Sequence, residues 1–255
     1  MAPVETKSLR VLLTGGGRGV GAASVRALAQ AGFGVTFTYR SASTEADALV
    51  AELAAAHPGQ GFEARALDLT DKAAVEAFAA TVADESYFGF VHNAGMPYDT
   101  LAAMMDQDKA EVLMQVNYWS FTRLAKAVVR GMMRARAGRI VGIGSIAALR
   151  GSQGNAPYAG SKAAIIGYAQ TLAAESARRG ITVNVIAPGF VDTDMLAPYA
   201  AFRQKMEAQI PLGRFVKPEE VAGLVAFLLS PPAGAITGQT LVIDGGLSST
   251  LTLQR

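Results

Sequence analysis

Short runs rich in Val, Ile and Leu alternate along this chain with longer, Ala-rich stretches that have helical spacing. Strands separated by helices of this length need right-handed crossovers, which produce a parallel sheet covered by helices on both faces. The pattern therefore predicts an α/β fold. The expected strands are 10–14, 34–40, 62–68, 87–93, 139–145, 181–189 and 240–246, and the expected helices are 21–32, 44–56, 71–84, 108–136 and 157–178.

The chain is expected to form one domain over residues 1–255, because neither a change of composition nor a Gly/Ser-rich linker marks a boundary. Hydrophobic residues make up 51% of the sequence and charged residues 17%, enough to bury a large core. Segment 190–217 is polar and fits neither the helical nor the strand period. A long connection at the rim of an α/β sheet is typical of a substrate lid, which is the prediction for this segment.

Composition excludes several classes of site. There is no cysteine, so disulfides, thiolate metal ligands and cysteine nucleophiles are absent, and two histidines are too few for a His-rich metal site. No apolar run approaches the ~18 residues that would span a bilayer, and the N-terminus lacks the apolar core of a signal peptide. The sequence therefore predicts a soluble, cytoplasmic protein without a metal.

Charge is distributed unevenly, although the net value is only +2. No acidic residue occurs between Val112 and Ala174, a stretch that carries eight basic ones. Such a stretch should attract anionic ligands or partners. Ion pairs with acids elsewhere, such as Asp106, Asp108 or Glu175, are an equally open interpretation. The basic residues are Arg123, Lys126, Arg130, Arg134, Arg136, Arg139, Arg150 and Lys162.

The first expected strand runs into TGGGRGVG, Thr14 to Gly21, and then into a helix. Gly15, Gly19 and Gly21 let the backbone approach a pyrophosphate, which would sit at the positive end of the helix. A glycine cluster alone is weak support, but one placed between a first strand and a helix is strong. The alternative is a tight turn without a ligand.

Two arginines indicate which dinucleotide this turn would bind. An acid at the end of the second strand would favour NAD, but Arg40 stands there and Arg18 projects from the glycine turn. Guanidinium groups can grip a 2′-phosphate bidentately, so the expected cofactor is NADP(H). Asp68, after the third strand, could accept a hydrogen bond from the adenine amino group, or it could simply cap the next helix.

Tyr158 and Lys162, in the stretch YAGSK, are expected on one face of a helix, one turn apart. A lysine cation about 4 Å from a phenolate interacts with it by about 4 kcal/mol at an effective dielectric constant of ~20. That energy corresponds to a pKa lowered by roughly 3 units, which would let the phenol exchange a proton near pH 7. The alternative is a surface lysine whose stem packs on the ring. Ser145, at the end of a strand, could hydrogen-bond a substrate carbonyl, or cap a loop.

These motifs together resemble the short-chain dehydrogenases/reductases over nearly the whole chain. TGGGRGVG, Asn93–Gly95, Asn117, Ser145, YAGSK and Ala187–Gly189 occur in that family's order, with similar spacing. The resemblance implies a Rossmann-type doubly wound sheet of seven parallel strands and a homotetramer. It implies catalysis by Asn117, Ser145, Tyr158 and Lys162, with Tyr158 as the proton donor and Asn117 supporting a water relay to Lys162.

The resemblance also implies a cofactor-binding set. Lys162 would hold the nicotinamide ribose, Asn93–Gly95 would line the adenosine side, and the segment after Ala187 would hold the carboxamide. The implied cofactor-binding residues are Thr14, Gly15, Arg18, Gly19, Val20, Gly21, Arg40, Asp68, Leu69, Asn93, Ala94, Gly95, Tyr158, Lys162, Pro188, Gly189, Val191 and Thr193.

Within the family, the chain looks most like the 3-oxoacyl-acyl-carrier-protein reductases, with features of the carrier-protein ketoreductases of aryl polyene and related polyketide-type pathways. This likeness implies reduction of a 3-oxoacyl thioester held by an acyl carrier protein, and Arg136 and Arg179 match positions that face this acidic partner. Reduction of a free ketone, sugar or steroid is the nearest alternative. A non-catalytic NADP-binding regulator is disfavoured by the intact site, and a serine hydrolase by the missing G-x-S-x-G pattern.

Two features depart from the family pattern. His92 stands where relatives often have Asn, and it is interpreted as a packed residue at the end of a strand rather than a catalytic one. The C-terminal tail, 247–255, extends beyond the usual ending and could reach a neighbouring subunit.

Overall fold

The computed structural model describes residues 9–249. Its seven strands form one sheet in the order β3-β2-β1-β4-β5-β6-β7, and every neighbouring pair is parallel. This arrangement confirms the expected Rossmann-type fold. The strands are β1 (Arg10–Thr14), β2 (Gly34–Tyr39), β3 (Phe62–Ala66), β4 (Gly89–His92), β5 (Gly138–Ile143), β6 (Ile181–Pro188) and β7 (Thr240–Ile243).

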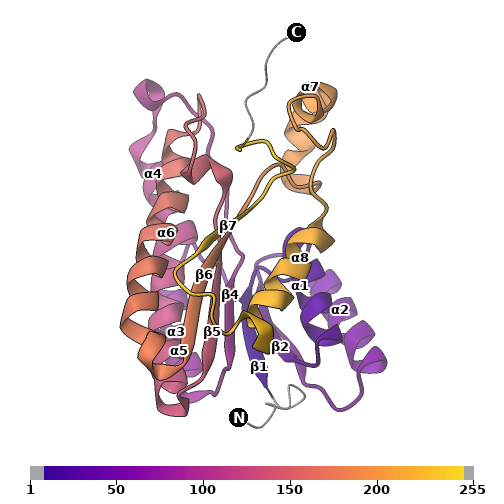
Figure 1. Ribbon diagram of the computed structural model, residues 1–255, viewed down its shortest axis with the longest axis vertical. Helices are drawn as coiled ribbons and strands as arrows, with labels where there is room; N and C mark the ends of the chain where they lie inside the picture. The colour runs from indigo at the N-terminus through magenta and orange to yellow at the C-terminus, as the bar shows by residue number, and fades with distance from the viewer. Residues whose placement is uncertain (1–8, 250–255) are drawn as a thin grey trace.

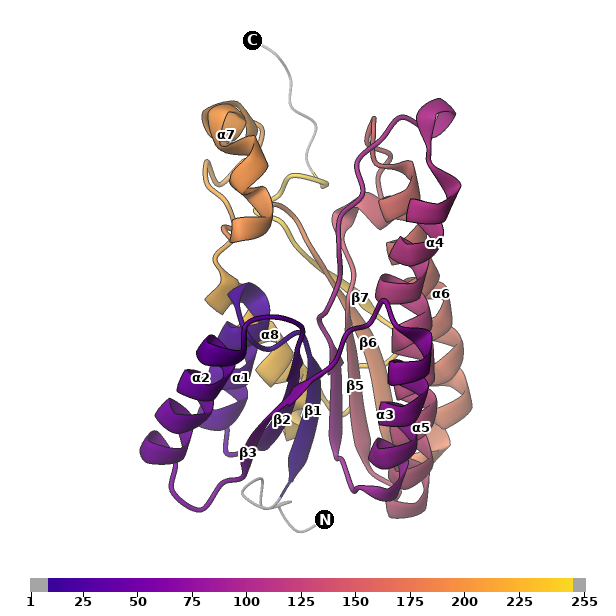
Figure 2. The ribbon, with the colours of Figure 1, turned by 180° about the vertical axis from the view of Figure 1, so that it is seen from behind.

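Helices cover both faces of the sheet (Figures 1 and 2). One face carries α1 (Gly19–Gln30), α2 (Ser43–Ala56) and α8 (Pro218–Leu229). The other carries α3 (Lys72–Asp84), α4 (Gln107–Met114), α5 (Ser120–Ala135) and α6 (Ala156–Ser176). Each layer has its own apolar core, and the largest fully buried side chains include Phe33 and Phe37 on one side and Phe90 and Phe121 on the other. Burial on both faces explains why the strands are continuous apolar runs.

Helix α8 was not among the helices expected from the sequence. Pro218 begins it, and the Glu220 carboxylate accepts a hydrogen bond from the Lys217 backbone amide at 2.8 Å. Proline in the first turn followed by an acid is an ordinary start signal, so the stretch KPEE contained enough information to predict this helix.

The expected helical region 108–136 is confirmed, with a change of helix type inside it. It consists of α4, a π-helical turn over Gln115–Trp119 (η3), and α5. A π turn inserts one residue without disturbing the apolar side chains on either side of it, so the hydrophobic spacing does not reveal it. Helix α5 ends at Ala135, and the next residue, Arg136, has a φ of 53° and is the one non-glycine residue with a positive φ among residues 9–249.

Segment 190–217 lies beyond the carboxyl ends of the strands (Figure 1). It contains the 3-10 segment Asp194–Phe202 (η6) and α7 (Arg203–Glu207). Arg203 donates two hydrogen bonds of 2.8 Å to the Asp192 carboxylate, which ties the segment to itself. Two other contacts anchor it: the Tyr199 hydroxyl donates to the Asp99 carboxylate, and the Leu212 amide donates to the Gly245 carbonyl.

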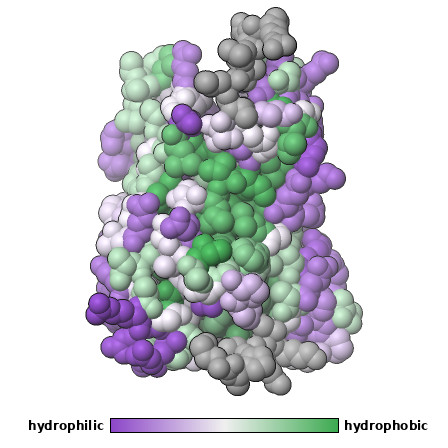
Figure 3. All heavy atoms as spheres, in the orientation of Figure 1, coloured by the Kyte–Doolittle hydropathy of each residue, from purple (hydrophilic) through white to green (hydrophobic). Residues whose placement is uncertain are grey.

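Strand β7 forms one edge of the sheet. Figure 3 shows hydrophobic atoms gathered near the middle of the face on which Figure 1 shows β7. Val242 in this strand is 43% exposed. Within residues 9–249, no helix is both long and apolar enough to cross a membrane. The predicted contact of the tail with another subunit falls largely outside the part of the chain that the structure describes.

Candidate active site

The glycine turn between β1 and α1 is shaped for a close approach. Gly15 and Gly19 have φ of 72° and 53°, conformations that a side chain would strain. A Cβ added at Gly21 would lie 1.9 Å from the Gly15 carbonyl oxygen, so the turn packs against the helix without room for one. Arg18 occupies the N-cap position of α1, but its side chain accepts no hydrogen bond from the helix. The first turn of α1 also contains no acidic residue. The helix therefore offers free backbone amides and a positive end to an anion, which fits a pyrophosphate.

The side chain of Asn93 stabilises this turn by hydrogen bonds to its backbone. Its Nδ2 donates to the carbonyl oxygens of Gly15 at 2.9 Å and Thr14 at 3.2 Å. The Thr14 hydroxyl oxygen, in turn, accepts from the backbone amides of Asn93 and Ala94, both at 3.2 Å. These bonds join the ends of β1 and β4, the two strands at which the strand order reverses. Ligands of open α/β sheets bind at such a reversal.

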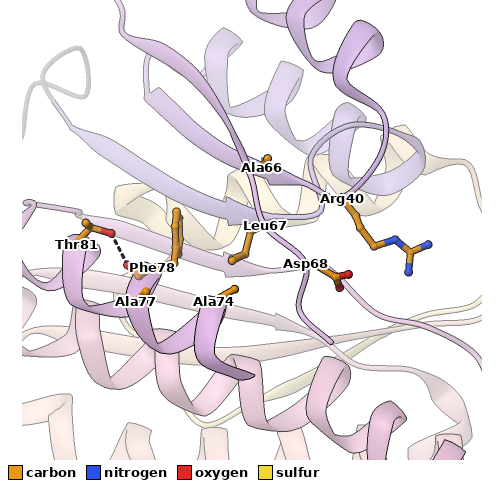
Figure 4. A pocket seen from close by; sticks show the side chains of 8 residues that line it. All are labelled: Arg40, Ala66, Leu67, Asp68, Ala74, Ala77, Phe78 and Thr81. Atoms are coloured by element: carbon orange, nitrogen blue, oxygen red, sulfur yellow. Dashed lines mark hydrogen bonds between the residues drawn. The ribbon is translucent and has the colours of Figure 1, made fainter. Parts of the chain in front are cut away.

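Arg40 and Asp68 lie at one end of a shallow groove beside β3 (Figure 4). Arg40 and Arg18 are exposed, and neither forms an ion pair within residues 9–249. Asp68 does not cap α3; Asp71 does, by accepting from the Ala73 and Ala74 amides. Asp68 instead accepts from the backbone amide and hydroxyl of Thr70, and these bonds, with the charge of Arg40, lower its pKa. The alternative interpretation of Asp68 as the helix cap is therefore wrong.

Ser145, Tyr158 and Lys162 come together beyond the carboxyl end of β5. Ser145 follows that strand, and its Oγ accepts from the Ala147 amide at 3.1 Å. Tyr158 and Lys162 lie on one face of α6, with the lysine Nζ 5.8 Å from the centre of the phenol ring. Lys162 is only 3% exposed and donates to the Ile143 carbonyl at 2.8 Å. It is therefore not the surface lysine of the alternative interpretation.

The expected lowering of the Tyr158 pKa is wrong for this structure. Burial raises that pKa, a hydrogen bond with Ser145 lowers it, and the charge of Asp99 raises it further. Burial also lowers the pKa of Lys162 to about 8. Desolvation is the largest cause for both groups, although only Lys162 is fully buried and Tyr158 is half-buried, and the lysine Nζ donates to the Ile143 carbonyl.

Asn117 joins the loop after β4 to helix α6. Its Oδ1 accepts from the Met96 amide at 2.9 Å, and its Nδ2 donates to the Met96 carbonyl at 3.1 Å and to Ser161 Oγ at 2.9 Å. Ser161 donates onward to the Tyr158 carbonyl at 2.8 Å. A Cβ built on Gly95 would lie 3.1 Å from Lys162 Nζ and 3.3 Å from Asn117 Oδ1. Glycine at this position therefore keeps a small space open beside both groups.

The segment after β6 approaches the same edge of the sheet. Pro188 ends β6, the Gly189 amide donates to the Ile243 carbonyl at 3.0 Å, and Val191 forms an isolated bridge with Val216. The methyl carbon of Thr193 lies 3.3 Å from where a Gly19 Cβ would be, which brings this segment against the glycine turn.

Sequence reasoning missed several residues that shape the site. Asp244 is buried and accepts from the amides of Gly246 and Ser248, and a Gly189 Cβ would lie 2.7 Å from its Cβ. An acid before two glycines at the end of the last strand was a usable signal for this turn. No signal in the sequence indicated the contact between Asp99 and Tyr199, because the two residues are 100 positions apart.

The structure separates two predicted residues from the rest. Arg136 precedes β5 and Arg179 precedes β6, so both lie at the amino ends of strands whose carboxyl ends carry Ser145 and Pro188. Of the basic residues between Val112 and Ala174, only Arg123 forms an ion pair within residues 9–249, with Glu76 at 3.4 Å. The alternative interpretation, that several of these residues pair with acids elsewhere, therefore holds among the described residues for Arg123 alone, and none of them pairs there with Asp106, Asp108 or Glu175.

Comparison with known proteins identifies the family of this chain. The family model described as Enoyl-(Acyl carrier protein) reductase matches residues 15–248. The 3-oxoacyl-acyl-carrier-protein reductase FabG of Vibrio cholerae is 41% identical over 241 residues, which cover 92% of this chain and 96% of that protein.

Two solved structures have the same fold. A short-chain dehydrogenase/reductase from Serratia marcescens has a TM-score of 0.88 and 33% identity, and the match covers 96% of this chain and 100% of that one. A gluconate 5-dehydrogenase from Burkholderia cenocepacia, solved with NADP and tartrate, has a TM-score of 0.88 and 30% identity over 96% and 97% of the two chains. The chain therefore belongs to the short-chain dehydrogenase/reductase family of oxidoreductases.

Proposed function

We propose that this enzyme reduces a 3-oxoacyl thioester, carried by an acyl carrier protein, to the 3-hydroxyacyl thioester with NADPH. The observation that carries the proposal is the grouping of Ser145, Tyr158 and Lys162 at the edge of the sheet that also holds the glycine turn. The choice of substrate is supported by relatives such as the Vibrio cholerae reductase, whose name specifies this reaction.

The catalytic residues act on the substrate carbonyl. Ser145 Oγ accepts from the Ala147 amide and keeps one proton, which it can donate to the carbonyl oxygen when a substrate lies between it and Tyr158. Bound NADPH would supply the hydride. Tyr158 gives its proton to the oxygen as negative charge develops there, and its raised pKa keeps it protonated at neutral pH. Lys162 binds the nicotinamide ribose, and Asn117 supports a water relay that returns a proton toward Lys162.

The remaining predicted residues hold the cofactor in this proposal. The amides of Gly19, Val20 and Gly21 bind the pyrophosphate, and Gly15, whose own amide donates to the Thr38 hydroxyl at 3.3 Å, forms the turn that it approaches. Asp68 and Leu69, with Asn93–Gly95, surround the adenosine, and Pro188, Gly189, Val191 and Thr193 hold the carboxamide. Segment 190–217 acts as the lid, anchored across the site by Tyr199 and Asp99. The NADP in the Burkholderia cenocepacia enzyme is consistent with this choice of cofactor.

The two exposed arginines predict a preference for NADPH. Neither Arg18 nor Arg40 has an ion-pair partner within residues 9–249, so both are available to a 2′-phosphate. The enzyme is expected to bind NADPH at least tenfold more tightly than NADH. Replacing both arginines with Ala should weaken NADPH binding by tenfold or more without changing NADH binding, as measured by fluorescence titration. Similar affinities for the two cofactors in the wild-type enzyme would contradict this assignment.

The carrier protein would dock at Arg136 and Arg179. Nine residues of chain lead from Arg136 to Ser145, most of them in or next to β5, so at ~3.3 Å per residue the two lie up to about 30 Å apart. A carrier docked there would therefore deliver its substrate to the site of another subunit of the expected homotetramer. The left-handed backbone of Arg136 costs stability for a non-glycine residue, which favours a functional reason for an arginine at this position. The expected cytoplasmic location also remains part of the proposal.

Turnover on a panel of substrates tests the function. NADPH oxidation should be fastest with a carrier-bound 3-oxoacyl chain, slower with a small acetoacetyl thioester, and at least about a hundredfold slower with free ketones or sugars. Arg136→Glu and Arg179→Glu should raise KM for the carrier-bound substrate only. Arg136→Gly suits the backbone and should raise that KM without loss of stability, which separates docking from folding.

Other outcomes identify the alternatives. Preference for a free sugar or ketone would favour the competing activity, which the likeness to the gluconate 5-dehydrogenase supports. No NADPH oxidation with any substrate would favour a binding protein without chemistry. Equal effects of the arginine variants on both thioesters would contradict docking at Arg136 and Arg179.

A further inference from the structure

His92 bridges the nucleotide end of the site to its catalytic end. It ends β4, is completely buried, and contacts the solvent nowhere. Its Nδ1 lies 3.0 Å from the Thr14 hydroxyl at the end of β1, and its Nε2 lies 3.2 Å from the backbone carbonyl of Asn117. The imidazole thus joins the residue before the glycine turn to the π-helical turn that carries Asn117.

The surrounding hydrogen bonds determine which ring nitrogen carries the proton. The Thr14 hydroxyl oxygen accepts from two backbone amides, those of Asn93 and Ala94, so both of its lone pairs are occupied. Its single proton can therefore only be donated to His92 Nδ1. Nδ1 must then be unprotonated, and the ring proton lies on Nε2, from which it is donated to the Asn117 carbonyl.

The ring also stays neutral. Burial, together with the positive charge of Lys162, lowers the His92 pKa to about 3. A charged imidazole would need to donate from Nδ1 to a hydroxyl that has no free lone pair. His92 therefore has one protonation state and one tautomer, and each nitrogen has one assigned partner.

We propose that His92 is a positioning residue that holds the Asn117 backbone, and with it the π-helical turn, in place beside Lys162 and helix α6. Asn117 can bridge Met96 and Ser161 only while its backbone keeps this position. Without the imidazole, the backbone carbonyl of Asn117 would lose this donor. A buried carbonyl without a hydrogen bond is costly, so the Asn117 backbone would move to find another donor. The proposal rests on the catalytic role proposed above for Asn117.

Packing alone does not account for this arrangement. The imidazole stacks on Phe121 at 5.2 Å between ring centroids and lies 6.2 Å from Phe90, contacts that a phenyl ring would also make. A phenyl ring would supply neither hydrogen bond. The substitution His92→Phe therefore removes the polar link and keeps an aromatic ring, whereas His92→Gln offers an amide donor near the position of Nε2.

Kinetics of these variants test the proposal. His92→Phe should lower kcat at least tenfold and change KM for NADPH less than threefold, and His92→Gln should restore kcat to within threefold of the wild-type enzyme. Phe121→Leu is the matched control, because it removes the stacking partner and keeps the hydrogen bonds. It should lower the melting temperature but keep kcat within threefold. The proposal is wrong if His92→Phe has the kcat of the wild-type enzyme, or if His92→Gln folds but does not restore kcat. It is also wrong if Phe121→Leu lowers kcat as much as His92→Phe does.

A second measurement needs neither a foldable variant at His92 nor a known substrate. Nitrogen-15 NMR of histidine-labelled protein should show His92 as the neutral tautomer protonated at Nε2 at pH 7. Only two histidines exist, so His57→Gln assigns the signals. The Nδ1-protonated tautomer, or a charged ring, would overturn the proposal. Turnover by the wild-type enzyme tests the proposed function separately. Failure of the proposal for His92 can therefore be distinguished from failure of the proposed function.

Discussion

The Tyr158→Phe enzyme is expected to lose at least about a hundredfold in kcat while binding NADPH as tightly as the wild-type enzyme. The substitution removes one oxygen and keeps the ring. Without the hydroxyl, the oxygen that receives charge during reduction has no positioned proton donor, and general acid catalysis of this kind contributes typically 10²–10⁴-fold. Ser145 can still hydrogen-bond the carbonyl, but a hydrogen bond alone does not transfer a proton to its oxygen.

Tyr168→Phe provides the matched control for this variant. Tyr168 lies ten residues further along the same helix, about 15 Å from Tyr158 at 1.5 Å per residue, so it loses the same atom away from the reacting carbonyl. Its kcat should remain within threefold of the wild-type value. Stopped-flow measurement of NADPH oxidation and fluorescence titration of NADPH give kcat and Kd separately. A Tyr158→Phe enzyme within threefold of wild-type activity would overturn the assignment of Tyr158 as the proton donor.

The sheet and most of the helices could be predicted because each depends on local spacing. The seven expected strands all occur, with ends shifted by a few residues. Helix ends and strand ends depend on caps and on pairing with distant segments, which hydrophobic spacing does not report. The residues after the strands could also be grouped from sequence, because carboxyl ends of parallel strands meet at one edge of the sheet.

The properties that the sequence did not reveal depend on the enclosure of the site. The pKa of Tyr158 depends on how completely it is removed from water and on Asp99, which lies in a loop 59 positions earlier. Spacing within YAGSK indicates that a lysine is one turn away, but not that its proton is donated to Ile143. The role of His92 was also hidden in the sequence, where it is one residue of an apolar strand. Its contacts with Thr14 and Asn117 are seen only in the folded structure.

Replacing Gly21 with Ala is expected to weaken NADPH binding at least a hundredfold and to lower the melting temperature by about 5–10 °C. The added methyl group would lie 1.9 Å from the Gly15 carbonyl oxygen and 2.7 Å from Asn93 Nδ2. Neither obstacle is the free end of a side chain: the first is backbone, and the second already donates to the Gly15 and Thr14 carbonyls. Relief therefore requires the glycine turn to move away from α1.

Gly17→Ala distinguishes this steric effect from a general loss of glycine in the turn. Its added Cβ would lie 3.5 Å from the Cβ atoms of Ala42 and Tyr39, which is ordinary contact, and its φ is not positive. Because the same turn gains the same methyl group at both positions, only the distance to fixed backbone differs. Gly17→Ala should remain within about 2 °C and threefold in Kd of the wild-type protein. Equal losses in the two variants would mean that the close packing of Gly21 against Gly15 does not shape the cofactor turn.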